Sequence, residues 1–320
     1  MMINILSRFK TSLMFARYLG RNFRPDTFFA AKIYFNLAKS LNYAEYLNRK
    51  RLSDSFAIQN KKIKHNEGYY IGNFKRVKDS KKVMGAINYF RRKHKLINWK
   101  EIEKKSKKPF LLKKEVKLSK ELQTICIPLV KIISKYIGCY PVFLRAELWH
   151  SPNKINFTGR SQNWHIDGED TKQIKVFIPL EKVDEFSGPL NFIDASNSYN
   201  IYSSLKKNKI IKTRNTKLSD DIIRSLVPKN FIKKMTMDLG EYGLLDTCRC
   251  YHFGSRKDKK PRKLIFLHFT SPFAENFPTI FRKPHLEKSN EEERLLYGYV
   301  RQDYKVLKSE KIKRWDFKFY

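Results

Sequence analysis

Apolar side chains recur at spacings of three and four residues through much of the first half of the chain. The segment DTFFAAKIYFNLAKSLNYAEYLNRKR (26–51) has this spacing, which predicts helix because such positions share one face of a 3.6-residue turn. A second helix is expected at about 78–93. A third should occupy 119–138, with Ser119 capping its first turn and Gly138 ending it.

The pattern changes near residue 140, where short apolar runs replace the helical spacing. Gly, Pro, Asn and Ser separate the runs, which is typical of turns between short strands. One helical insert (217–231) interrupts them, and residues 290–311 return to helical spacing. Upstream, EGYYIGNF (67–74) predicts a strand and the lysine-rich KKSKKPFLLKKEVK (104–117) predicts a solvated loop. The apolar runs are PVFLRAELWH, KQIKVFIPLE, GPLNFI, YGLLDTCRCYHF and RKLIFLHFTS.

Many short strands in series indicate a β-sandwich or barrel, here over about 140–272. Helices from both ends of the chain should cover it, which makes the fold class α+β with a mainly β core. We therefore expect three parts. A basic helical extension spans 1–60, a central domain spans 61–275, and a C-terminal helical extension spans 276–320.

Composition limits the partners. With 320 residues, of which 41% are hydrophobic and 14% aromatic, the chain can bury a sizeable core, which excludes wholesale disorder. Its net charge of +36 suggests nucleic acid or an anionic membrane as a partner. The lysines are nevertheless scattered among many Asn and Ile residues, a pattern that AT-rich genomes produce. This scatter favours compositional bias, so nucleic acid is not the expected partner.

The first 25 residues are basic, and the first acidic residue is Asp26. They lack the continuous apolar core of a signal peptide, and no apolar run of 18 residues that would span a membrane occurs. We expect a helix packed on the domain, an amphipathic segment on an anionic membrane surface or, in a eukaryote, an organelle-targeting sequence. The four cysteines have neither disulfide-framework nor zinc-site spacing, which suggests reduced thiols in a cytoplasmic protein. They are Cys126, Cys139, Cys248 and Cys250.

The stretch QNWHIDGED (162–170) places His165 and Asp167 two residues apart. On a strand such residues point to one face, but this pair alone is weak support for a metal site. His252 strengthens it, because it ends another apolar run and completes the two-histidine, one-carboxylate set of non-haem Fe(II) oxygenases. Such a set leaves coordination positions for a 2-oxo acid and dioxygen. Arg262, ten residues later, could pair with a second carboxylate on that acid.

These motifs, in this order, resemble the phytanoyl-CoA dioxygenase (PhyH-like) family of Fe(II)/2-oxoglutarate-dependent oxygenases. HNEGYYIGNF is similar to the family's early strand, and NWHIDGED to its H-x-D strand. PLEKVDEFSGPLNFIDASNS is similar to its next hairpin, while DTCRCYHFGS and RKLIFL supply the histidine and arginine in family order. The resemblance spans about 66–272. Ala195 departs from it, since the family often has glycine at this turn.

The resemblance implies a double-stranded β-helix, or jelly-roll, fold over the central domain. It also implies Fe(II), 2-oxoglutarate as co-substrate, and dioxygen, with release of succinate and CO2 coupled to hydroxylation of a small-molecule or lipid-like substrate. The metal ligands carried over are His165, Asp167 and His252. Arg262 would pair with the distal carboxylate of 2-oxoglutarate, Ser255 could add a hydroxyl there, and Arg145 could face the other end of the co-substrate.

Three alternatives stand beside this interpretation. Related halogenases replace the metal-binding carboxylate with a small residue, whereas Asp167 is present here. Nucleic-acid dealkylases carry an R-x5-R pair, which Arg256 and Arg262 match in spacing, but their arginines lie further beyond the distal histidine. The third is a basic protein that binds a membrane or nucleic acid on an oxygenase scaffold. Three histidines without a partner pattern are expected to be structural: His150, His268 and His285.

Overall fold

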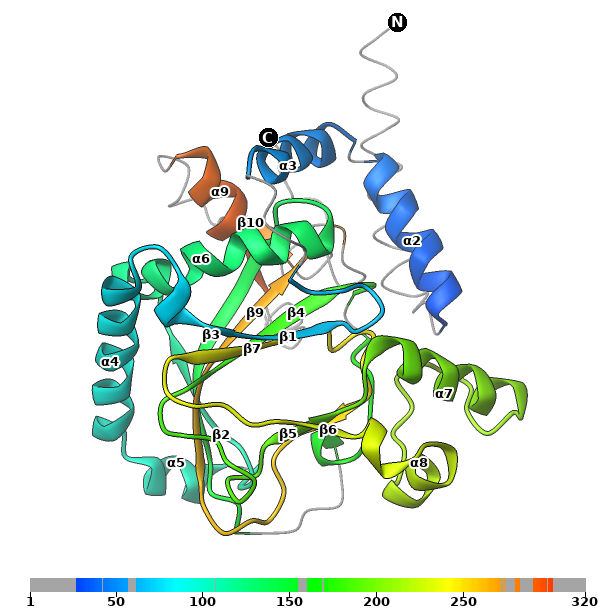
Figure 1. Cartoon of the computed structure of the whole chain (residues 1–320). Helices are drawn as coiled ribbons and strands as arrows, with labels where there is room; N and C mark the ends of the chain where they lie inside the picture. Colours follow the sequence, from blue (N-terminus) through cyan, green and yellow to red (C-terminus); the bar gives the residue numbers. More distant parts are fainter. Residues whose placement is uncertain are drawn as a thin grey trace, which may run out of the picture.

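The computed structural model describes most of the central chain (Figure 1). Among these residues, no helix is both long and apolar enough to cross a lipid bilayer. The predictions for residues 1–26 and 302–320, including the membrane-binding role of the basic N-terminus, lie outside the described residues. The structure describes residues 27–41, 43–56, 62–106, 108–154, 160–168, 170–271, 273, 280–282, 290–297 and 299–301.

The helices expected in the first half are confirmed. The 26–51 segment forms two helices rather than one, α2 and α3, and the helix expected at 78–93 is α4. Ser119 caps α6, where its hydroxyl accepts a hydrogen bond of 3.3 Å from the Leu122 amide, and Gly138 ends the helix at a φ of +90°. The bounds are α2 Phe28–Leu41, α3 Tyr43–Ser55, α4 Ser80–Leu96, α5 Trp99–Lys105 and α6 Lys120–Ile137.

Six antiparallel strands form the larger sheet. The strand predicted at 67–74 is its first member. The solvated loop expected at 104–117 is wrong, because this segment contains the end of α5 and the edge strand β2, whose backbone pairs with β3 although lysines fill much of it. In spatial order the strands are β1 Tyr69–Asn73, β7 Glu241–Leu245, β4 Gln173–Pro179, β9 Arg262–Thr270, β3 Val142–Ser151 and β2 Leu112–Val116.

A smaller antiparallel sheet lies opposite the larger one (Figure 1). Its strands are β6 Lys233–Met235, β5 Leu190–Phe192 and β8 His252–Phe253, in that order. Two isolated bridges continue it, His165 with His252 and Trp164 with Leu218. The two facing antiparallel sheets confirm the double-stranded β-helix core.

Helices close the outer side of each sheet. Side chains of α4 and α6 pack with the outward residues of β4 and β9 in the largest apolar core. Over the smaller sheet, α7 (Ala195–Lys207) and α8 (Asp220–Leu226) enclose a second core, and a third lies between the sheets. Helix α7 was not expected. The helix expected at 217–231 is shorter, because Pro228 separates α8 from the 3-10 turn Lys229–Phe231.

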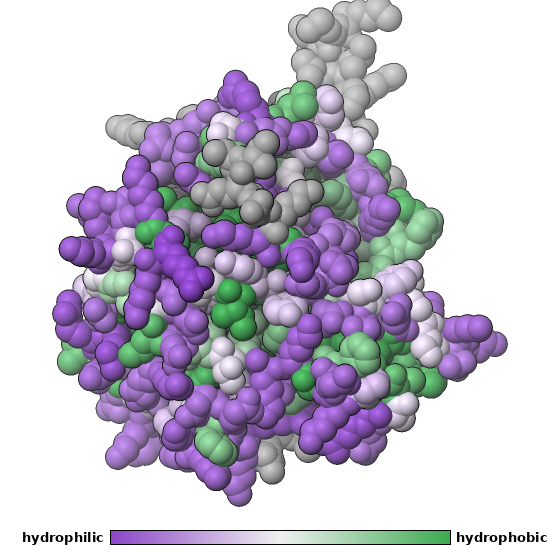
Figure 2. Space-filling model, in the orientation of Figure 1, coloured by the Kyte–Doolittle hydropathy of each residue, from purple (hydrophilic) through white to green (hydrophobic). Residues whose placement is uncertain are grey.

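The C-terminal segment is not purely helical. It contains the helix α9 (Glu291–Tyr297), as expected, but also a two-stranded sheet made of β10 (Ile280–Arg282) and β11 (Tyr299–Arg301). Leu295 and Tyr297 of α9 are buried in the largest core. Most of the face in Figure 2 is hydrophilic, in keeping with the lysine-rich composition.

A fully buried arginine fastens α3 to the β core. Arg49 donates from Nη1 to the carbonyls of Tyr140 and Pro141 (3.1 and 3.2 Å) and from Nε to Glu45 (2.8 Å). Arg49→Met should lower the free energy of unfolding by about 2 kcal/mol, because the carbonyls would lose buried donors. Urea denaturation measures this. The exposed neighbour Arg51→Met should change stability by less than about 0.5 kcal/mol, and equal effects of the two would contradict the anchoring role.

Candidate metal centre

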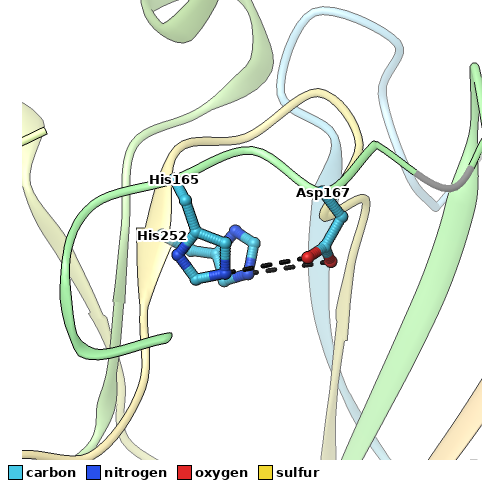
Figure 3. A group of neighbouring side chains, drawn as sticks. All are labelled: His165, Asp167 and His252. Atoms are coloured by element: carbon cyan, nitrogen blue, oxygen red, sulfur yellow. Dashed lines mark ion pairs between the residues drawn. The ribbon is translucent and has the colours of Figure 1, made fainter. Parts of the chain in front are cut away.

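The structure brings His165, Asp167 and His252 together (Figure 3). The expected H-x-D strand is reduced to short bridges, and the backbones of His165 and His252 exchange two hydrogen bonds of 3.0 Å. The two imidazole rings lie side by side, with centroids 4.3 Å apart. Asp167 follows in a loop, where its amide donates to the Thr247 carbonyl (2.8 Å). One atom from each of the three side chains lies within 4.8 Å of the others.

The hydrogen bonds of the two histidines fix which ring nitrogen faces the centre. Nδ1 of His165 lies 2.8 Å from the Asn163 carbonyl, and Nδ1 of His252 lies 3.0 Å from the Cys250 carbonyl. A carbonyl can only accept, so each Nδ1 carries the ring hydrogen. The Nε2 atoms, 3.7 and 3.8 Å from the Asp167 carboxylate oxygens, therefore present lone pairs to the centre. Metal-binding histidines are held in this way.

Electrostatics set the charge of the three donors. Burial, with a smaller effect from His165, lowers the pKa of His252 to about 3, so its imidazole is neutral at physiological pH. Burial alone would raise the pKa of Asp167, but Lys175 and the two histidines hold it well below its usual value. The centre thus combines the neutral imidazole of His252 and the ionised carboxylate of Asp167 with the imidazole of His165, a donor set that suits a divalent transition metal.

Side chains from β4 orient the Asp167 carboxylate. Lys175 Nζ lies 2.5 Å from Oδ2, and Gln173 Nε2 donates to the same oxygen (3.1 Å) and to Thr247 Oγ1 (2.8 Å). His268 Nε2 lies 2.7 Å from Gln173 Oε1, so this histidine supports the centre indirectly. The sequence analysis missed Gln173 and Lys175. Their spacing of two residues on the strand after the H-x-D motif was the available signal.

A second carboxylate, that of Asp170, ties the loop after the motif to the end of β9. Asp170 is fully buried and accepts hydrogen bonds from Thr270 Oγ1 (2.6 Å) and the Ser271 amide (3.0 Å). Arg214 Nη1 donates to the Asp170 carbonyl (3.1 Å). Within QNWHIDGED, Asp167 lies at the candidate metal centre, whereas Asp170 fixes the loop that follows.

Gln173→Leu should lower the affinity for Co(II), used in place of Fe(II), by about tenfold or more. Loss of an outer hydrogen-bond partner of a metal ligand costs 10–100-fold in related centres, roughly. Calorimetric titration of the metal-free protein measures the change. Ile174→Val, one residue along and on the other face of β4, is the matched control and should leave metal affinity unchanged. Unaltered affinity in Gln173→Leu would exclude this orienting role.

Arg262 opens β9 as a buried cation, with a side chain that is almost fully enclosed. It shares a strand face with Phe266 and His268, and that face meets Asp167 through the β4 side chains. Its Nε has no hydrogen-bond partner within the described part of the chain. Burial lowers the pKa of Arg262 to about 10, so the guanidinium is still charged at physiological pH. A buried cation of this kind needs an anionic partner.

Ser255 lies in the same region but has a structural hydrogen bond. Its hydroxyl contacts the Asn153 side-chain oxygen closely and lies 3.1 Å from the Gly188 carbonyl. Both neighbours are acceptors, so the Ser255 proton points to one of them. The hydroxyl can offer a co-substrate only its lone pairs, which a carboxylate does not use.

The other two arginines of interest differ in their partners. Arg145 of β3 lies 3.8 Å from Glu147 and 5.7 Å from the Phe266 ring centroid, so it faces the interior between the sheets. Arg256 forms a bidentate pair with Asp220 (2.7 and 2.9 Å). This pairing uses the Arg256 guanidinium and does not fit the R-x5-R role of the dealkylases.

Comparisons with known proteins give remote structural likenesses. No protein-family model matches the sequence, and no curated protein sequence is similar to it. Among solved structures, HygX from Streptomyces hygroscopicus with nickel and 2-oxoglutarate is 12% identical (TM-score 0.45), covering 77% of this chain and 98% of HygX. EctD from S. alaskensis with 2-oxoglutarate and 5-hydroxyectoine is 15% identical (TM-score 0.42), covering 69% and 75%. The epimerase SnoN with Fe3+, alpha-ketoglutarate and nogalamycin RO is 12% identical (TM-score 0.44), covering 80% and 96%.

Proposed function

We propose that the protein is an Fe(II)- and 2-oxoglutarate-dependent dioxygenase of the PhyH-like type that hydroxylates a small-molecule substrate. The carrying observation is the convergence of His165, Asp167 and His252, together with the buried Arg262, whose Nε has no hydrogen-bond partner among the described residues. We also propose that 61–275 is the dioxygenase domain and that 1–60 and 276–320 are extensions of it.

The residues of the site fit both Fe(II) and 2-oxoglutarate. The Nε2 atoms of two imidazoles and one carboxylate would hold Fe(II) at three positions. The Arg262 guanidinium matches the planar carboxylate of a 2-oxo diacid and would neutralise its distal charge. When bound, Fe(II) with 2-oxoglutarate and dioxygen would supply the oxidising chemistry that releases succinate and CO2 and hydroxylates the substrate.

Residues of the chain orient the three metal ligands and shield the centre from water. Gln173 and Lys175 hold the Asp167 carboxylate at the centre, while the His165–His252 backbone bridge fixes the two rings. The apolar residues between the sheets, including Leu264 and Phe266, keep water from the reacting centre. Fold and cofactor leave the substrate open.

The direct test is anaerobic. Fe(II) and then 2-oxoglutarate are added to the metal-free protein, and the visible absorption spectrum is recorded. An intact site gives a weak charge-transfer band that requires both additions, and dioxygen then yields succinate. Absence of the band and of succinate would overturn the proposal in favour of a binding protein on an oxygenase scaffold.

A further inference from the structure

The face of the larger sheet that points toward the smaller one carries an aromatic wall. Trp149 of β3 stacks on Phe266 of β9, with ring centroids 4.1 Å apart and planes inclined by 10°. Phe177 of β4 meets both rings edge-on, with its ring centroid 6.0 Å from that of Trp149 and 5.9 Å from that of Phe266. Phe177 and Phe266 are buried, whereas Trp149 is partly exposed, so Trp149 is the ring of this wall that a small molecule could contact.

Three cations border this wall. Lys113 Nζ lies 4.7 Å from the Trp149 ring centroid, and Arg145 lies over the Phe266 ring. Lys175 reaches from the next strand and contacts Asp167, so it joins the wall to the candidate metal centre. The pKa of Lys113 is lowered, mainly by burial. The positive charges of Arg145 and Lys175 lower it further, and the negative charge of Glu147 opposes them.

Among the described residues, one partly buried carboxylate serves both Lys113 and Arg145. Glu147 accepts from Trp149 Nε1 (2.6 Å) and lies 3.4 Å from Lys113 and 3.8 Å from Arg145. Within the described ranges, both cations share this one carboxylate. The exposed Glu115, the cross-strand neighbour of Glu147, adds a second negative charge at the rim.

Metal and co-substrate binding would not supply the missing negative charge. The charges of a divalent ion, the Asp167 carboxylate, Arg262 and a 2-oxoglutarate dianion would cancel one another. Lys113 and Arg145 would still share Glu147, the one partly buried carboxylate that the described residues place beside both, while Glu115 is exposed. A partly buried cation excess is costly unless an anion fills it.

We propose that the substrate is a small molecule with an oxyanion group, a carboxylate or a phosphate, which Arg145 and Lys113 bind beside the aromatic wall. The planar guanidinium of Arg145 suits either oxyanion, and its Nε has no partner within the described ranges. The apolar part of the substrate lies against the partly exposed Trp149, with its reacting carbon toward the metal centre. This inference rests on the proposed dioxygenase function and reassigns Arg145 from co-substrate to substrate.

The test uses two matched probe pairs, benzoate with benzamide and phenyl phosphate with phenol. Zn(II) replaces Fe(II) and 2-oxoglutarate is kept saturating, so that neither pair competes for Arg262. Dissociation constants are measured by ligand-observed NMR. At least one anionic probe should bind about tenfold or more tightly than its neutral counterpart, as a charge-assisted hydrogen bond supplies. The pair that shows the preference identifies the carboxylate or the phosphate.

Variants locate the effect. Arg145→Met and Lys113→Met should each reduce the anion preference several-fold. Lys114→Met removes one positive charge from the same strand but from its other, exposed face, and should leave the preference intact. Glu147→Gln keeps an oxygen for Trp149 Nε1 while removing the competing charge, and should tighten anion binding. It serves as the test if Arg145→Met fails to fold.

Two outcomes separate this inference from the proposed function. Failure of Zn(II) and 2-oxoglutarate to bind, recorded beforehand by calorimetry, overturns the dioxygenase proposal and the substrate inference with it. Normal binding of both, with equal affinity for charged and neutral probes, overturns the substrate inference alone. A preference for the anion that survives in Arg145→Met and Lys113→Met alike also overturns it.

Discussion

Replacing His252 by alanine should abolish succinate formation and lower affinity for a divalent metal by more than about 100-fold, since loss of an outer hydrogen-bond partner alone costs roughly 10–100-fold. The Nε2 lone pair of His252 points to the centre, and the described residues place no other histidine there. Its backbone bridge to His165 does not involve the imidazole. The variant should therefore remain folded. Co(II) titration and succinate release measure the effect.

A matched histidine separates ligand loss from histidine loss. His65 is exposed and lies beside Arg249, in contact with neither Asp167 nor the two centre histidines. His65→Ala should keep both metal affinity and turnover. Full turnover in His252→Ala would show that the metal, if bound, lies elsewhere.

Replacing Arg262 by alanine should raise the 2-oxoglutarate concentration for half-maximal turnover by about 30-fold or more. Removing one partner of a desolvated charge pair costs about 2–5 kcal/mol, and each 1.4 kcal/mol is about tenfold. The burial of Arg262, and the lack of a partner for its Nε in the described part of the chain, support the upper part of this range. Succinate release against co-substrate concentration, for wild type and variant, measures the shift.

Companion measurements make the Arg262 result specific. Co(II) affinity should change little, because the guanidinium is no ligand. Arg262→Lys should recover part of the loss, since an ammonium keeps the charge but not the planar fork. Pyruvate, which lacks the distal carboxylate, should distinguish the two proteins poorly. An unchanged half-saturation value would exclude Arg262 from the co-substrate site, and since Arg256 is paired with Asp220, Arg145 would become the candidate.

Local chemistry explains which elements the sequence predicts. The helix α6 is specified twice, by the Ser119 cap and by Gly138 in the left-handed region. Helix α7 is not specified in this way, because its sequence ASNSYNIYSSLKK is rich in Ser and Asn, which favour turns. It forms because Ile201 and Leu205 are buried against the smaller sheet and Asp194 caps it. The Asp194 cap is local, but the burial of Ile201 and Leu205 is tertiary and leaves little local pattern.

In edge strand β2, the local sequence favours a loop, whereas pairing with a neighbouring strand produces a strand. Its sequence LKKEV has the charge of a solvated loop, and only the pairing with β3 makes it a strand. Charged residues are frequent on edge strands because they oppose pairing with other chains. Charge alone therefore misleads where one side of a strand faces solvent.

The candidate site was predictable to the extent that its chemistry is tied to sequence spacing. His165 and Asp167 are two residues apart, and His252 and Arg262 follow in order, so these four could be named in advance. The spacing of Gln173 and Lys175 places them on one strand face, but their contacts with Asp167, like the role of Glu147, depend on which strands pair and which face points inward. The aromatic wall also appears only with that register.

The backbone bridge between His165 and His252 bears on which metal the protein acquires. Two of the three donors are locked to each other by peptide hydrogen bonds, so the opening between their nitrogens is set before an ion arrives. Such a rigid, three-point nitrogen and oxygen set accepts several first-row divalent ions, and intrinsic affinity for Co(II), Ni(II) and Zn(II) exceeds that for Fe(II). Which ion binds would then depend on the supply of iron in the cell. Co(II), Ni(II) and Zn(II) would compete with Fe(II) for the centre, and a chelator would remove them.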